Sequence, residues 1–134
     1  HSLIMAASIL TLLKGYAIFA FLMGSASTVL GNNMMGDSTL FTPKSTSSAL
    51  TDSQIRYLGS HFAATGAIVW WASNNLLERK VPLAICGACL VAGGFGRLRA
   101  GLKHGFGPNT KAAMNVEIFL PTLFYIFGKV VGEW

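Results

Sequence analysis

The apolar residues of this chain fall into four long blocks that are separated by polar stretches of different lengths. Within each block the apolar positions are nearly continuous, so they do not mark one face of a helix or strand. A helix needs about 20 apolar residues to cross the core of a bilayer. We therefore predict helices at about residues 3–30, 52–77, 81–99 and 111–131, within a single transmembrane domain that covers residues 1–134.

The polar stretches predict how these helices connect. Residues 31–51 are rich in Gly, Ser, Thr and Asn but also contain methionines, which favours a loop folded like a lid over one end of the bundle. A mobile polar loop is the alternative. Residues 51–54 fit a capping box at the start of the second helix, and residues 78–80 and 105–110 are typical of turns. The predicted fold is all-α, an integral membrane four-helix up-down bundle.

The composition supports lipid as the solvent. Only 11% of the residues are charged, whereas soluble domains carry about a quarter, and the mean hydropathy is +0.53. The net charge of +5 comes from basic residues at the ends of the apolar blocks, where they can reach lipid headgroups. We therefore expect membrane lipid as a partner and no nucleic acid. The predicted localisation is an integral membrane protein, with the endoplasmic reticulum as one candidate compartment.

Small residues recur at four-residue spacing, which lets membrane helices approach closely. This pattern is found at Ala20 and Gly24, at Gly59, Ala63 and Ala67, and at Ala88, Ala92 and Gly96. It predicts close contacts between helices of the chain, or with a membrane partner or a second copy in a homo-oligomer. Lys14 interrupts the first apolar block, and it either snorkels to the interface or faces a cavity.

Each predicted helix also carries polar residues near the same end of the bundle. These residues are Asn32, Asn33, Arg56, His61, Arg97, Arg99, Asn115 and Glu117. Arg97 and Arg99 lie about 200° apart around their helix, so we expect only Arg97 to point inward. Glu117 lies about 8 Å inside its helix, and Pro121 leaves the Glu117 carbonyl without its helical hydrogen bond. A charge at such a depth needs a partner or a function.

This cluster supports two functional hypotheses. In the first, Glu117 is the general acid or base of an intramembrane enzyme, Arg97 tunes it and His61 assists as a proton shuttle. The reaction would be isomerisation, cyclisation or hydration of a lipophilic small molecule, without cofactor or metal. The predicted substrate-binding residues are Arg56, Asn32, Asn33, Asn115 and Trp70. In the second, Arg97 and Glu117 form a structural pair, and the protein is a non-catalytic membrane subunit or a lipid-binding module.

Other residue types point to less chemistry. No spacing of His or Cys residues matches a metal site. Cys86 and Cys89 have redox spacing, but on a membrane helix with small neighbours we interpret them as packing residues. A direct contact between Arg97 and Glu117 without a void would favour the second hypothesis, and an enclosed cavity at Glu117 would favour the first.

Several short motifs resemble those of a family of small four-helix membrane proteins, domain-of-unknown-function family 4345. They are Arg56-Tyr57-Leu58-Gly59, Ala64-Thr65-Gly66, Gly93-Gly94-Phe95-Gly96-Arg97 and Glu117-Ile118-Phe119-Leu120-Pro121. The resemblance covers about residues 50–125 and implies a four-helix integral membrane fold with a shared polar feature. It singles out Arg56, Gly94, Gly96, Arg97 and Glu117, and it implies no established activity. The long loop after the first helix departs from shorter members of the family.

Overall fold

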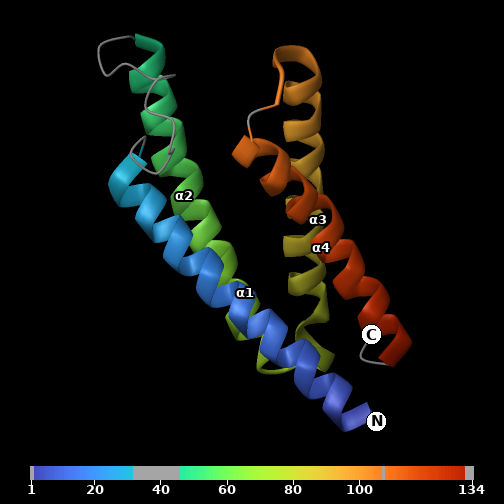
Figure 1. Cartoon of the computed structure of the whole chain (residues 1–134). Helices are drawn as coiled ribbons and strands as arrows, with labels where there is room; N and C mark the ends of the chain where they lie inside the picture. The colour runs from blue at the N-terminus through green and yellow to red at the C-terminus, as the bar shows by residue number, and fades with distance from the viewer. Residues whose placement is uncertain (1, 32–45, 107, 132–134) are drawn as a thin grey trace. The chain divides into compact units, whose positions relative to one another are not determined.

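The structure, a computed structural model, describes residues 2–31, 46–106 and 108–131, which are almost entirely helical. The helices of this part of the chain are α1 (Ser2–Leu30), α2 (Thr46–Ser73), α3 (Leu76–His104) and α4 (Pro108–Val131) (Figure 1). The predicted all-α fold with four helices is confirmed. The predicted lid over residues 31–51 falls mostly outside the described residues, as do Asn32 and Asn33.

Three stretches are long and apolar enough to cross a membrane, namely Ala7–Leu30, Leu76–His104 and Lys111–Val130. They lie in α1, α3 and α4, and by length and composition they indicate an integral membrane protein. Helix α2 is not among these three stretches, although the sequence predicts a membrane helix there. The reason is visible in its first half, where Asp52, Arg56 and His61 lower the hydropathy.

Helix α2 begins earlier than predicted, at Thr46. Residues 51–54 therefore lie inside the helix, and the prediction of a capping box at Thr51 is wrong. The Asp52 carboxylate instead accepts a hydrogen bond from Arg56, one turn later on the same helix. The i,i+4 spacing that such a pair requires is present in the sequence.

The connection between α2 and α3 is also shorter than predicted. The turn lies at Asn74 and Asn75, where the Asn75 amide N–H donates to the Ala72 carbonyl (3.1 Å) and the Asn75 side chain donates to Glu78 (2.8 Å). Residues 78–80, which the sequence predicts as the turn, belong to α3 but contain a kink at Arg79 (φ −114°, ψ 18°). Pro82 explains the kink, because it has no N–H for the Glu78 carbonyl and its ring crowds the preceding turn.

A short turn joins α3 to α4. Gly105 adopts a left-handed φ of +91°, which favours glycine, and its N–H donates to the Gly101 carbonyl (2.8 Å). The ring of Phe106 packs directly on Gly101, where a Cβ would collide with it. Helix α4 then begins at Pro108, whose fixed φ suits a first helical position. Residues 108–110, which the sequence predicts as part of the turn, consequently lie inside the helix.

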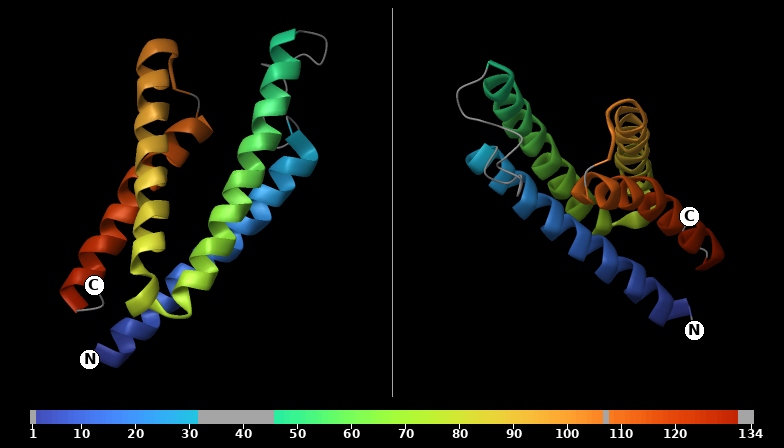
Figure 2. Two further views of the ribbon diagram at one scale, coloured as in Figure 1. Left: turned by 180° about the vertical axis from the view of Figure 1, so that it is seen from behind. Right: turned by 45° about the horizontal axis from the view of Figure 1, so that its top comes forward.

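The contacts divide the chain into two compact units. One unit, Leu13–Trp71, consists of most of α1 and of α2. The other contains α3 and α4 together with the start of α1. Within each unit the two long helices run antiparallel and lie side by side in all views (Figure 2).

Glycines hold α1 and α2 at backbone contact. A Cβ at Gly59 would lie 2.7 Å from the Gly24 carbonyl oxygen, and a Cβ at Gly66 would lie 2.6 Å from the Ala17 carbonyl oxygen. The close contact predicted at Gly24, Gly59 and Ala63 is thus confirmed. The α2 side of this contact continues through Gly66, whereas Ala67 is exposed.

Glycine-to-alanine exchanges test this contact, with Gly15 as a matched control on α1. A Cβ at Gly15 meets nothing within 4 Å, so Gly15→Ala should leave the free energy of unfolding unchanged or raise it by up to about 1 kcal/mol. Gly59→Ala should lower it by about 1–3 kcal/mol, because backbone atoms of α1 block the new methyl group. Denaturant unfolding of the protein in detergent micelles measures both. Equal effects of the two substitutions would contradict backbone contact at Gly59.

Candidate functional site

An ion pair joins α3 to α4. The Arg97 Nε–H group lies 2.9 Å from Glu117 Oε2 and 3.1 Å from Glu117 Oε1, so the donor is shared between the two carboxylate oxygens. The Glu117 side chain is 19% exposed and the Arg97 side chain 48%. The carboxylate is therefore the more buried partner of the pair.

The residues around the pair explain why it can form. Gly94 lies one turn before Arg97, and a Cβ at Gly94 would lie 2.5 Å from the Ile118 side chain and 3.2 Å from Glu117 Cβ. The absence of a side chain at Gly94 thus lets α4 approach α3 beside the ion pair. Further along the same interface, a Cβ at Gly87 would lie 3.5 Å from Pro121 Cβ, an ordinary van der Waals distance. Within the glycine cluster of α3, Gly94 is thus the residue that meets α4, whereas a Cβ at Gly93 or Gly96 would meet nothing within 4 Å.

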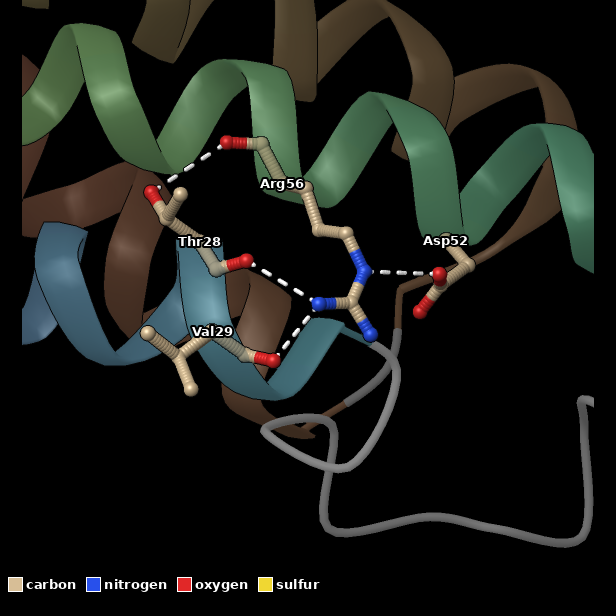
Figure 3. Close-up of polar contacts among 4 residues, drawn as sticks. All are labelled: Thr28, Val29, Asp52 and Arg56. Carbon is tan, nitrogen blue, oxygen red and sulfur yellow. Dashed lines mark hydrogen bonds and ion pairs between the residues drawn. The ribbon is translucent and has the colours of Figure 1, made fainter.

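A second arginine joins α2 to the end of α1. The Arg56 side chain reaches across to α1, where its Nη1 donates to the carbonyls of Thr28 (3.1 Å) and Val29 (2.5 Å) (Figure 3). Its Nε–H donates to Asp52 Oδ2 at 2.8 Å. The last carbonyls of a helix have no partner within the helix and carry partial negative charge. Arg56 therefore caps the C-terminus of α1.

Gly31 completes this cap. It follows α1 with a left-handed φ of +56°, the usual conformation of a residue that ends a helix. A Cβ at Gly31 would collide with the Asp52 carboxylate and would lie 2.8 Å from Arg56 Nε. Only glycine fits both the backbone conformation and the space beneath the Arg56–Asp52 pair.

The other predicted site residues have local surroundings of their own. His61 is exposed, and its Nδ1 lies 2.9 Å from the Tyr57 carbonyl oxygen on the same helix, so it does not share the Arg56 contacts. Arg99 and Asn115 are exposed. Trp70 is 42% exposed, and the Lys14 ammonium lies 4.3 Å from the centre of its ring. The catalytic and substrate-binding roles assigned to these residues stay predictions.

Sequence reasoning missed Asp52, the α1 carbonyls and the Lys14–Trp70 contact. Asp52 and Arg56 could have been paired by their i,i+4 spacing. The other contacts depend on how α1 and α2 are rotated against each other, which hydropathy does not specify. Among the described residues, no group of three His, Cys, Asp or Glu side chains could hold a metal ion, and Cys86 and Cys89 are free thiols.

Removal of the Arg56 cap should loosen the end of α1. Arg56→Gln should lower the free energy of unfolding by about 1–2 kcal/mol, because two carbonyls and Asp52 lose a cationic donor. Arg56→Lys should lower the free energy of unfolding by less than Arg56→Gln does, because the charge remains but the ammonium lacks the planar fork of the guanidinium. Hydrogen exchange should become faster in the last turn of α1. Arg99→Gln is the control, and equal exchange in the Arg56 and Arg99 variants would refute the cap.

Comparison with known proteins agrees with the motifs that surround these contacts. No curated protein and no solved structure gave a significant match. The family described as Domain of unknown function (DUF4345) matches residues 9–127. This range contains Arg56, Arg97 and Glu117, the residues that make the interhelical contacts described above. Because the match spans most of the chain, the protein belongs to this family.

Proposed function

We propose that the protein is a non-catalytic membrane subunit whose charged residues hold its helices together. The observation that carries this proposal is the direct contact between Arg97 and Glu117. In an acid–base reaction the oxygens of Glu117 would exchange a proton with the substrate. Here the Nε–H group of Arg97 engages both of these oxygens.

Arg56 supports the same interpretation. It lies on a different helix pair, and its guanidinium is also bound by a neighbouring helix and by Asp52. Charged groups in a membrane protein are costly unless they are paired or functional, and the contacts of Arg56 and Arg97 meet the first condition. The acid–base isomerase, cyclase or hydratase that the sequence also suggests remains a prediction, and the experiment below decides between the two.

Association with a partner would use an exposed ridge of small residues on α3. The ridge continues the predicted four-residue pattern in both directions and consists of Ala84, Ala88, Ala92, Gly96 and Ala100, all of which are exposed. A Cβ at Gly96 meets nothing within 4 Å. Membrane helices associate through such faces because small side chains allow close packing. The partner would be a membrane helix, with a second copy of this chain as the simplest case.

Glu117→Gln tests the non-catalytic proposal, because it removes the charge and the proton-transfer group while keeping the shape. If the pair is structural, the free energy of unfolding should fall by about 1 kcal/mol and the lipophilic metabolites of the host should be unchanged. Lys111→Gln, at an exposed position on α4, controls for loss of one charge. A stable Glu117→Gln protein together with accumulation of one lipophilic metabolite would establish the enzyme instead.

Ala92→Leu tests the ridge, and Ala112→Leu at an exposed position on α4 is its control. We expect the wild-type protein to give a crosslinked product of higher mass in native membranes. The leucine at position 92 would keep a partner helix at a distance, so the Ala92→Leu protein should lose this product. The control should keep that product. Unchanged crosslinking of the Ala92→Leu protein would exclude the ridge as an interface.

A further inference from the structure

The end of α3 and the start of α4 carry three cations that the contacts between these helices do not use. They are Arg99, Lys103 and Lys111, here called the basic patch, and all three are exposed. Within the described part of the chain, their side chains make no hydrogen bond or ion pair, in contrast to the guanidinium of Arg97. Residues 98–116 contain no Asp or Glu, so this segment has no negative side chain of its own to balance the patch.

Helix dipoles account for only one of these cations. The last carbonyls of a helix carry partial negative charge, which favours a cation in the last turn, and Lys103 lies in the last turn of α3. Arg99 lies more than one turn before the end of α3. Lys111 lies in the first turn of α4, where the partial positive charge of the amide groups disfavours a cation. Arg99 and Lys111 therefore call for negative charge from another source.

The length of the uncharged part of α3 places the basic patch at the level of the lipid headgroups. Residues 81–96 are uncharged and cover about 24 Å at 1.5 Å per residue, whereas the hydrocarbon core is about 30 Å thick. Arg97 therefore lies near the edge of the core, and Arg99 and Lys103 lie about 3 and 9 Å further along the helix axis. Lys111 begins the candidate span of α4, so it lies at the same boundary.

Apolar side chains lie next to the basic patch. Leu102 is 75% exposed and Phe106 is 38% exposed, and both lie between Lys103 and its neighbours in the turn region. A surface that combines cations with exposed apolar side chains suits the boundary between headgroups and acyl chains. It suits a polyanion dissolved in water less well, because the apolar side chains would then stay in contact with water.

We propose that the basic patch binds anionic lipid headgroups and thereby anchors the turn between α3 and α4 at the membrane surface. The charge of the patch complements a negative headgroup, and its depth brings the cations to the lipid phosphates. A zwitterionic headgroup has an ammonium group of its own beside the phosphate, so it gains less from the patch. The proposal does not rest on the proposed role of the Arg97–Glu117 pair, since it uses other side chains.

The lipid selectivity of the protein tests the proposal. The protein is purified into nanodiscs that contain phosphatidylcholine and phosphatidylglycerol in equal amounts, and the lipids retained after extraction into detergent are counted by native mass spectrometry. Wild-type protein should retain phosphatidylglycerol over phosphatidylcholine by roughly fivefold, the ratio that corresponds to about 1 kcal/mol for one basic residue at a membrane surface. Equal retention of the two lipids would overturn the proposal and would leave the cations as signals for membrane orientation only.

Matched double variants assign that preference to the basic patch. Lys103→Gln combined with Lys111→Gln should lower the ratio to below about twofold, whereas arginine at both positions should keep the ratio because the charge remains. Lys80→Gln combined with Lys129→Gln is the control, since it removes two exposed lysines from the opposite ends of the same two helices, and it should keep the ratio. A preference that survives in the first double variant, or that falls equally in both, would refute a site at the patch.

Two further measurements give an answer if the double lysine variant fails to fold. Arg99→Gln should lower the ratio on its own, because it removes one cation of the patch. Extraction of the wild-type protein at about 1 M instead of about 0.1 M salt shortens the Debye length from about 10 Å to about 3 Å, so the preference should disappear. An unchanged ratio in the folded Arg99→Gln protein, or at the higher salt concentration, would overturn the proposal.

Discussion

Close contact between helix backbones is the interaction on which this structure depends. Lipid removes most of the hydrophobic driving force between helices, so their association relies on packing and hydrogen bonds. Gly59 meets Gly24 between α2 and α1, and Gly94 meets Ile118 between α3 and α4, each at a distance that excludes a Cβ. These contacts set the spacing within each helix pair, and the polar contacts follow from that spacing.

The two arginines of these pairs act at points where the glycines bring the helices together. Arg97 reaches Glu117 one turn from Gly94, and Arg56 reaches the last carbonyls of α1 beside Gly31. Smaller polar groups are satisfied within their own helices, as where Thr11, Thr65 and Thr122 donate to the carbonyl four residues earlier. This is the expected behaviour where no water is available to bind polar groups. The charged residues are thereby part of the packing between helices.

The sequence predicts the helices well because the length of an apolar block translates directly into a membrane span. It predicts α1 to within a residue at each end, and helical phase correctly selects Arg97 over Arg99 as the residue that contacts the neighbouring helix. It fails at the start of α2, where Thr51 and Gln54 imitate a cap inside a longer helix. Near Pro82, the sequence is compatible both with a turn between two helices and with a kink in one continuous helix.

The cap at Arg56 and the contact of Lys14 with the Trp70 ring could not be predicted for a different reason. Both depend on the rotation of α1 against α2, which is set by the glycine contact and not by hydropathy. In the sequence, Arg56 is a charged residue near the end of a predicted helix, where a ligand-binding residue could equally lie. The structure shows that its guanidinium binds the carbonyls of the adjacent helix. A charged residue near a membrane interface thus has the same sequence pattern whether it binds a ligand or a helix end.

A double-mutant cycle with charge exchange at Arg97 and Glu117 tests the structural role of the ion pair most directly. The proteins Arg97→Glu, Glu117→Arg and the double exchange are compared with wild type by unfolding in micelles. If the pair holds α3 to α4, each single exchange should lower the stability and the double exchange should restore most of it. If the double variant is no more stable than the sum of the two single effects allows, the pair does not hold these helices together.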